Sequence, residues 1–192
     1  MTDVTGPGRV LVVCTGNICR SPLLERVLQR ALDRRWGTGG YQVRSAGTHG
    51  LEGHPMDERA ASVLRALGGT PSGFVARRLR PAMVAEADLV LTATTAHRGL
   101  VVRAHPLALR YAFTFREFAA LADTLDDDQL PGPEGPPSGR LRDLAATLVT
   151  RRGPGVVDDA DIVDPFRRED AVYQQMDAQV RVALPGVLRA LT

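Results

Sequence analysis

Short apolar runs alternate along the chain with longer segments whose apolar residues recur every three or four positions. The apolar runs predict four β-strands, at residues 10–13, 41–45, 88–92 and 110–113. Strands that alternate with helical segments are typical of a parallel sheet wrapped by helices. We therefore expect an α/β fold.

Three segments have apolar residues at helical spacing, at residues 23–32, 57–67 and 169–191. Ser21 can cap the first of these helices, and Pro22 fits its first turn, where no amide hydrogen is required. Gly68-Gly69 predicts the end of the second helix. Pro185 lies inside the third, where it is expected to kink or interrupt the helix.

One segment has the composition of an exposed loop rather than of a packed element. Residues 130–139 read LPGPEGPPSG and follow a run of three aspartates. A short helix is expected after them, at residues 140–152. We therefore predict a flexible N-terminus at residues 1–8 and a single domain at residues 9–192, with a Pro/Gly-rich insertion near residues 126–140.

Composition excludes several classes of protein. The chain has 192 residues, 24% of them charged, and a net charge of only +2, so a broad basic surface for nucleic acid is not expected. No apolar run approaches the ~20 residues that span a membrane, and the first eight residues lack the apolar core of a signal peptide. Two cysteines do not make a disulfide framework, so we expect reduced thiols and a cytoplasmic location.

Both cysteines lie in one loop, within the stretch VLVVCTGNICRSP at residues 10–22. The loop runs from Cys14, at the end of the first predicted strand, to Arg20, at the start of the first predicted helix. If it curls, its N–H groups point inward and bind an anion, and the helix N-terminus adds positive potential. Gly16 allows the backbone angles that a tight curl needs.

The side chains of this loop suit phosphate chemistry. Arg20 offers a planar fork that matches two phosphoryl oxygens. The same positive field favours the thiolate form of Cys14, which makes it a nucleophile. Ser21 can donate a hydrogen bond to that sulfur.

The two cysteines also allow two other interpretations, a buried apolar role and a zinc site. A cysteine at the end of a strand is commonly a small buried apolar residue, but that does not explain the polar residues and the Arg beside Cys14. Cys14 and Cys19 have the same spacing as His49 and His54, which would suit zinc. A cation is disfavoured because Arg20 adjoins Cys19.

At this point the chain resembles a known family. CTGNICRSP at 14–22 resembles the signature of the low-molecular-weight protein tyrosine phosphatases, and four further segments resemble family segments in the same order. They are SAGTHG at 45–50, ADLVLTAT at 87–94, FTFREF at 113–118 and DPF at 164–166. The resemblance implies one domain with a four-stranded parallel sheet, helices on both faces, and the phosphate-binding loop between the first strand and the first helix.

The resemblance also implies a mechanism. Cys14 would attack phosphorus and form a phosphocysteine, Asp164 would act first as general acid and then as general base, and no metal or cofactor would be needed. Apolar neighbours and Pro165 are expected to position Asp164 and partly desolvate it. Arg20 and the rest of the loop would hold the phosphoryl oxygens. The loop residues are Thr15, Gly16, Asn17, Ile18, Cys19, Arg20 and Ser21.

Two loop residues have further expected roles. Asn17 would brace the loop through side-chain hydrogen bonds. Cys19 would form a reversible disulfide with Cys14 and so protect it from overoxidation. Neither His97 nor His105 is expected to be catalytic, and both are predicted to be surface or packing residues.

The expected substrate cleft departs from the family pattern. Its residues are His49, Leu51, Phe166 and Arg167, and only one of them is aromatic, whereas the family usually supplies several aromatic rings. The substrate is therefore either a phosphotyrosine protein or a phosphorylated small metabolite of the sugar or nucleoside kind. Neither nucleic acid nor a membrane is an expected partner.

Three other functions were weighed against this one. Arsenate reductases of this fold need further downstream cysteines, which the chain lacks. Protein arginine phosphatases resemble the loop with Thr in place of Ile18, so the apolar side chain favours an ester substrate. A non-catalytic phosphate-binding module would be expected to have lost Cys14, Arg20 or Asp164, and all three are present.

Overall fold

The computed structural model describes residues 6–153 and 157–192. Residues 1–5 of the predicted flexible N-terminus lie outside the described residues, and Gly8 already belongs to the first strand. That the N-terminus is flexible stays a prediction.

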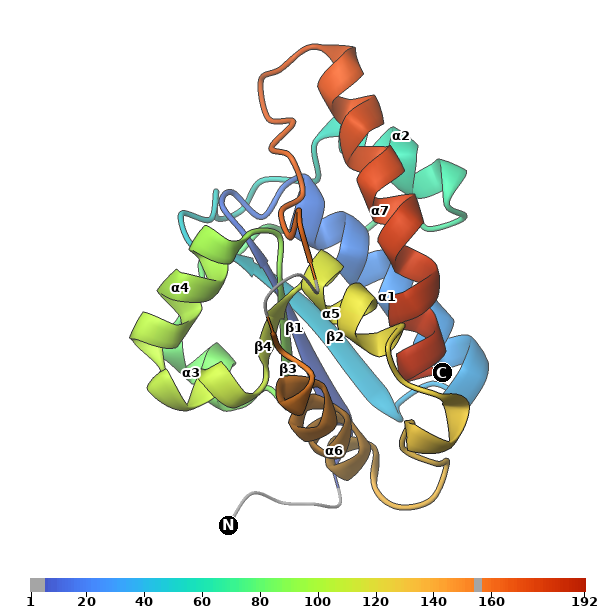
Figure 1. Cartoon of the computed structure of the whole chain (residues 1–192). Coiled ribbons are helices and arrows are strands. Elements are labelled where there is room, and N and C mark those ends of the chain that lie inside the picture. The colour runs from blue at the N-terminus through green and yellow to red at the C-terminus, as the bar shows by residue number, and fades with distance from the viewer. Residues whose placement is uncertain (1–5, 154–156) are drawn as a thin grey trace.

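A four-stranded parallel sheet forms the centre of the molecule (Figure 1). Its strands are β1 (Gly8–Cys14), β2 (Tyr41–Gly47), β3 (Leu89–Thr92) and β4 (Ala112–Thr114), in the spatial order β2-β1-β3-β4. The predicted parallel α/β fold is confirmed. The fourth strand was predicted too early, because Arg110 still belongs to a 3-10 helix and the strand begins at Ala112.

Helices cover both faces of the sheet. They are α1 (Arg20–Trp36), α2 (Glu58–Ala66), α3 (Pro81–Ala85), α4 (Thr95–Ala104), η1 (Pro106–Arg110), α5 (Phe115–Ala122), η2 (Asp127–Gln129), α6 (Pro137–Thr150) and α7 (Asp170–Leu191). In Figure 1, α3 and α4 lie on one side of the sheet, and α1, α2 and α7 lie on the other. Neither α3, α4 nor α5 was predicted as a helix from the apolar pattern.

The sequence placed the start of α1 two residues too late. The capping position is Cys19, without a side-chain hydrogen bond, and Ser21 and Pro22 are the second and third residues of the helix. Asp57 does cap α2, since its carboxylate accepts hydrogen bonds from two amides of the first turn. The third predicted helix, α7, runs through Pro185 to Leu191 without interruption, and a kink at Pro185 stays a prediction.

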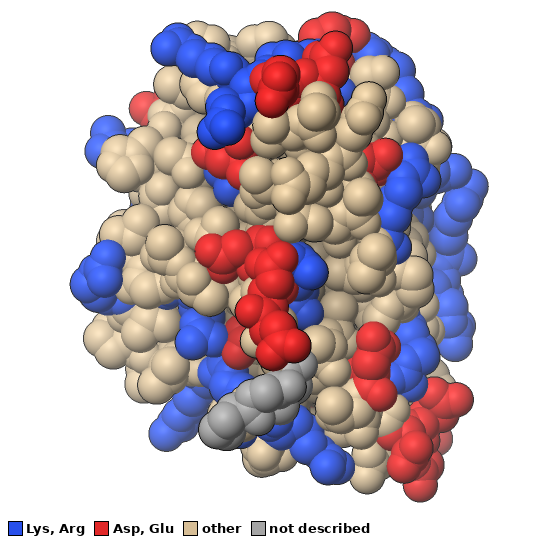
Figure 2. All heavy atoms as spheres, turned by 45° about the horizontal axis from the view of Figure 1, so that its top comes forward, with Lys and Arg blue, Asp and Glu red and all other residues tan. Residues whose placement is uncertain are grey.

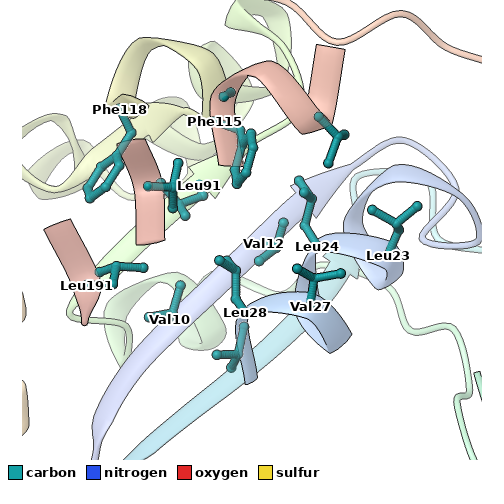
Figure 3. Packing of buried hydrophobic residues seen from close by; sticks show 14 of the residues in the cluster. Val10, Val12, Leu23, Leu24, Val27, Leu28, Leu91, Phe115, Phe118 and Leu191 are labelled. Carbon is teal, nitrogen blue, oxygen red and sulfur yellow. The ribbon is translucent and has the colours of Figure 1, made fainter. Parts of the chain in front are cut away.

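A large apolar core lies between the sheet and the helices α1, α5, α6 and α7. In Figure 3, Val10 and Val12 of β1 lie beside Leu24 and Leu28 of α1. Each large side chain buried in this way contributes about 1.5–3 kcal/mol to folding. On the opposite face, a smaller core joins Leu11, Val13, Val90, Val84 and Val101. Because β1 is buried on both faces, its carboxyl end, which carries Cys14, is held in place.

The irregular part of the Pro/Gly-rich segment is shorter than predicted. Helix α6 begins at Pro137, within the segment 130–139 that was expected to be irregular, and Ser138 is buried. Arg140 donates to the hydroxyl of Tyr41 at 2.9 Å, and its guanidinium lies 3.9 Å from the centre of the Trp36 ring. These contacts fix α6 against the end of α1 and the start of β2. That residues 126–140 are an insertion in the domain stays a prediction.

Candidate active site

The loop between β1 and α1 turns its carbonyl groups outward. Those of Cys14, Thr15 and Gly16 accept hydrogen bonds from the amides of Thr48, His49 and Leu51, at 2.9 to 3.0 Å. Within the described parts of the chain, the backbone amides of residues 15–19 donate no hydrogen bond to a protein acceptor. The loop therefore keeps these backbone N–H groups as free donors, as an anion nest requires.

Asn17 carries the special backbone conformation of the loop. Its φ is +55°, in the left-handed region, whereas Gly16, predicted to supply such freedom, is not among the residues with positive φ. The Asn17 amide offsets this strain by donating to Ser21 Oγ at 2.9 Å and to Ser45 Oγ at 2.7 Å. Its oxygen accepts from the amide of Arg77 at 2.8 Å. The predicted bracing by Asn17 is thus present in the structure.

This network also fixes the direction of the hydrogen bond at the sulfur. The Nδ2 group of Asn17 can only donate, so Ser21 Oγ accepts from it. The Ser21 proton is then free to point at Cys14 Sγ, which lies 2.9 Å from the hydroxyl oxygen. A hydroxyl donor at this distance stabilises a thiolate. Ser21 serves this purpose rather than capping α1.

Behind Asn17 lies a buried carboxylate that the sequence did not single out. Glu25 of α1 is 7% exposed and accepts from Ser45 Oγ at 2.5 Å. One of its oxygens also lies 3.9 Å from the guanidinium of Arg77. Glu25 and Arg77 therefore complete the support of the loop from α1 and from the segment after α2.

Arg20 has only part of its guanidinium engaged by protein groups. The side chain is 3% exposed, and Nη1 donates to the carbonyl of Ile162 at 3.1 Å. Nη2 lies 2.7 Å from Oδ2 of Asp164. Nε is buried and meets no acceptor among the described residues. The Nε and Nη2 edge is thus the one available for bidentate contact with a phosphoryl group.

Asp164 is held at the mouth of the site by backbone contacts. The amide of Ile162 donates to the carbonyl of Ala93 at 2.8 Å, and the amide of Val163 donates to Gln179 Oε1 at 2.9 Å. The Asp164 side chain itself is 50% exposed and paired with Arg20. Of its expected apolar neighbours, Ile162 is buried and Phe166 is 37% exposed, so partial desolvation of Asp164 stays a prediction.

The predicted residues surround a cavity of about 200 Å³. It is lined by Cys14, Thr15, Gly16, Ile18, Cys19, Arg20, His49, Leu51, Asp164 and Phe166. Three of the four expected cleft residues are among them. Arg167 is not; it has a φ of +59°, and its guanidinium lies 5.1 Å from the centre of the Phe166 ring. Phe166 forms one wall of the cavity, and His49 and Leu51 contribute the rest of its rim.

Cys19 lies on the buried side of the loop. Burial, followed by the negative charge of Asp57, raises the pKa of its thiol to about 12. The Cys19 thiol is therefore mostly protonated near neutral pH. Within residues 6–153 and 157–192, no group of three or more His, Cys, Asp or Glu side chains is placed to hold a metal ion.

His97 was predicted to be a surface or packing residue; it is buried, as a packing residue is, and it also contacts the phosphate loop. It is 6% exposed, and its Nε2 lies 2.9 Å from Oγ1 of Thr15 in the loop. No sequence signal near His97 pointed to the loop, since 82 positions separate it from Thr15. His105, at the other end of α4, lies outside the cavity and packs against Tyr111.

The family model described as low molecular weight phosphotyrosine protein phosphatase matches residues 9–133. The chain belongs to this family. It is an enzyme family, and Cys14 occupies the position of the phosphate-loop cysteine. Asp164 lies beyond the matched residues, and only the folded structure brings it to the phosphatase loop.

Individual relatives agree with this membership. The protein-tyrosine-phosphatase Etp of Escherichia coli is 36% identical over 124 residues, which cover 65% of this chain and 76% of Etp. A protein-arginine-phosphatase of Geobacillus stearothermophilus is 32% identical over 127 residues, 66% of this chain and 82% of the relative. The crystal structure of the tyrosine phosphatase AmsI of Erwinia amylovora superposes with a TM-score of 0.69, covering 97% of this chain and 94% of AmsI. At 24% identity, the last comparison speaks for the fold alone.

Proposed function

We propose that the chain hydrolyses phosphomonoesters through a covalent phosphocysteine on Cys14. The observation that carries this proposal is the set of unused donors around that sulfur. The amides of residues 15–19 and the buried Nε of Arg20 have no acceptor among the described residues, and all belong to the loop that starts at Cys14. Such a set of donors suits the equatorial oxygens of a phosphoryl group.

In the first step, the Cys14 sulfur attacks phosphorus in line with the leaving oxygen. The S–P bond forms as the P–O bond to the leaving group breaks, and Asp164 gives its proton to the departing oxygen. Ser21, which donates to the sulfur, lowers the energy of the thiolate before attack. The loop amides and Arg20 offset the charge on the equatorial oxygens.

In the second step, Asp164 accepts a proton from a water molecule that attacks the phosphocysteine. The S–P bond breaks, and Cys14 leaves as a thiolate, which the hydrogen bond from Ser21 again stabilises. Inorganic phosphate is released and Asp164 is left protonated for the next cycle. The loop and Arg20 carry the charge stabilisation, so the proposed mechanism uses no metal ion or cofactor.

Substrate binding has to open the contact between Arg20 and Asp164. The Nη2 that now faces Asp164 at 2.7 Å belongs to the edge that a phosphoryl group needs. A phosphoryl oxygen that takes Nη2 frees the Asp164 side chain from Arg20. Asp164 can move because its side chain is half exposed.

Phosphotyrosine in proteins is the proposed substrate class, since the ring of Phe166 is placed to contact a phenyl group at the cavity mouth. Phosphorylated small metabolites are the second candidate. Their support is the rest of the cavity lining, where His49 and Leu51 stand in place of a Trp or Tyr. Ile18 in the cavity lining supports an ester rather than a phosphoarginine substrate.

Nucleic acid is not a proposed partner. Figure 2 shows basic and acidic side chains interspersed over one face, with uncharged surface between them. A nucleic-acid surface would concentrate basic charge. Across the described ranges, the helices are all too short or too polar to span a bilayer. The cytoplasm is the proposed location, because both cysteines are free thiols and Cys14 reacts only in the reduced state.

An assay of phosphate release from aryl, alkyl and sugar phosphates tests the proposal. Wild-type protein is expected to release phosphate, and Arg20→Lys to lose at least a hundredfold in kcat/KM, because a point charge cannot replace the bidentate fork. Arg34→Lys, an exposed change on the same helix, is the matched control and should retain activity. Near-normal kinetics in Arg20→Lys would contradict phosphate binding by this loop.

A further inference from the structure

The first turn of α4 touches both halves of the site. His97 contacts Thr15 of the phosphate loop at 2.9 Å. Two residues earlier, the amide of Thr95 donates to Oδ1 of Asp161 at 2.7 Å, in the segment that leads to Asp164. Since His97 is almost fully buried, its ring is fixed by the groups that face it.

Both ring nitrogens of His97 have a threonine hydroxyl as partner. Nδ1 lies 2.7 Å from Oγ1 of Thr94, and Nε2 lies 2.9 Å from Oγ1 of Thr15. Oγ1 of Thr94 also accepts from the backbone amide of His97 at 3.2 Å, as the cap of α4. A neutral imidazole donates through one nitrogen and accepts through the other, so the two threonines have opposite roles.

One tautomer satisfies every group in this chain. If Nε2 carries the proton, Thr94 donates its hydroxyl proton to Nδ1 while accepting the backbone amide of His97. If Nδ1 carries the proton, Oγ1 of Thr94 accepts twice, and its own proton meets no acceptor among the described residues. Thr94 is partly buried, so in this second tautomer its hydroxyl proton would need solvent as its acceptor, whereas in the first it is paired within the protein. The contacts of Thr94 thus favour the Nε2–H form.

The tautomer decides what Thr15 can do. Nη2 of Arg20 lies 3.4 Å from Oγ1 of Thr15, and a guanidinium can only donate. With a second donor from His97, the Thr15 oxygen has both lone pairs occupied. Its proton is then free to turn into the cavity, which Thr15 lines together with Cys14 and Arg20. In the other tautomer, Thr15 would give that proton to His97 and none would remain for a ligand.

We propose that His97 is a positioning residue that holds the Thr15 hydroxyl as a donor to the bound phosphoryl group, so that Thr15 binds substrate through its side chain as well as its backbone. This inference rests on the proposed phosphatase function. It adds a side-chain donor to the loop amides and Arg20, on the side of the cavity that faces α4.

The surroundings of His97 keep its ring neutral, as this role requires. Burial and the nearby positive charge of Arg20 lower its pKa to about 4, and the carboxylates of Asp164 and Asp161 only partly oppose this. A neutral ring at assay pH keeps one nitrogen as donor and the other as acceptor.

Binding of inorganic phosphate, measured by calorimetry, tests the inference together with steady-state kinetics. Thr15→Val keeps the shape and removes the hydroxyl, so it is expected to weaken phosphate binding about tenfold. Thr15→Ser should restore most of that loss. His97→Leu should weaken binding in the wild-type background but add nothing to Thr15→Val, because the two residues act through one hydroxyl. His105→Leu, at the other end of α4, is the matched control and should bind phosphate normally.

The ring nitrogens give an independent readout that does not depend on the phosphate affinity of any variant. Nitrogen-15 NMR of the wild-type protein should show Nε2 protonated and Nδ1 unprotonated in His97, with His97→Gln used to assign the signal. His97→Gln offers a side-chain amide donor and should recover part of the binding lost in His97→Leu. If His97→Leu fails to fold, the phosphate affinities of Thr15→Val and Thr15→Ser and the NMR signal of His97 still test the inference.

Three results would overturn the inference. They are unchanged phosphate binding in Thr15→Val, a further loss when His97→Leu is added to Thr15→Val, and a proton on Nδ1 of His97. A wild-type protein that neither binds phosphate nor releases it from esters would instead contradict the proposed function itself.

Discussion

The guanidinium of Arg20 and the carboxylate of Asp164 meet at 2.7 Å across the mouth of the cavity. The pair joins the anion-binding loop to the segment that carries the general acid. It also means that the phosphoryl group and Asp164 compete for Nη2 of Arg20. Since the carboxylate is half exposed, the contact itself is worth only about 1 kcal/mol or less, and a dianionic substrate can displace it.

Asp164→Asn separates the acid role of this residue from its pairing with Arg20. Asparagine cannot supply the proton, so substrates with basic leaving groups should slow by about 10²–10⁴-fold, and activated aryl phosphates much less. The measurement is kcat/KM across aryl phosphates of graded leaving-group pKa. Asp161→Asn, in the same segment, is the matched control. Equal slowing of all substrates by Asp164→Asn would mean that Asp164 has another role.

His97 predicts how stability depends on pH. Its pKa falls from an ordinary 6.5 to about 4 on folding, because burial and Arg20, with a smaller effect of His49, outweigh Asp164 and Asp161. Between these two values the unfolded chain binds a proton that the folded chain does not. The free energy of unfolding should therefore decrease as pH falls from 7 toward 4, with a contribution from His97 of up to about 3 kcal/mol.

Urea unfolding at several pH values measures this contribution. The wild-type protein should lose more stability between pH 7 and pH 4.5 than His97→Gln, which has no ring to protonate. If both proteins lose the same amount, His97 takes up its proton in the folded state, and its proposed neutral form at the loop is wrong.

Much of the site could be predicted from the sequence because the loop is contiguous. Cys14, Asn17, Arg20 and Ser21 fall within eight residues, and the strand and helix beside them have clear apolar patterns. The start of α1 was misplaced for a physical reason. The Ser21 hydroxyl accepts from Asn17 and faces Cys14, so it is not used to cap the helix.

The residues that brace the phosphate loop from other elements could not be predicted, because they come from segments distant in the sequence. His97, Glu25 and Arg77 reach the loop only after the sheet has formed, and nothing in their local sequence marks them. Pro185 does not interrupt α7, because tertiary packing outweighs the hydrogen bond that proline cannot donate. Ala183 and Val187, on either side of it, are buried in the core.

Oxidation should link the two cysteines of the loop. Peroxide converts the Cys14 thiolate to a sulfenic acid, and Cys19 then attacks it to form a disulfide with release of water. A pKa of about 12 keeps Cys19 protonated, so the rate of disulfide formation should rise as pH increases from 7 to 9. The measurement is loss of activity after mild peroxide, followed by recovery with a dithiol.

Cys19→Ser is the control for that experiment. It should retain activity before oxidation but recover less of it afterwards, because the sulfenic acid of Cys14 continues to irreversible states. Full recovery by the variant after the same exposure would count against a protective disulfide.

Substrate preference follows from the composition of the rim. The cavity lining has Phe166 but has His49 in place of a second large aromatic side chain. Compared with a cleft that has both, the binding free energy for a phenyl group should be weaker by roughly 1 kcal/mol. We expect phosphotyrosine peptides to exceed the best small phosphorylated metabolites by less than a hundredfold in kcat/KM. His49→Trp should raise kcat/KM for phosphotyrosine peptides several-fold. A hundredfold or larger preference in the wild type, about 2.7 kcal/mol, would defeat this prediction.

The covalent step on Cys14 is tested most directly by trapping the phosphoenzyme. Protein mixed with an aryl phosphate and quenched in acid within one turnover should carry one phosphoryl group, which peptide mass spectrometry places on Cys14. Cys14→Ser should show neither turnover nor label, yet still bind phosphate or vanadate through the loop amides and Arg20. Appreciable hydrolysis by Cys14→Ser, or a label on any residue other than Cys14, would contradict the mechanism.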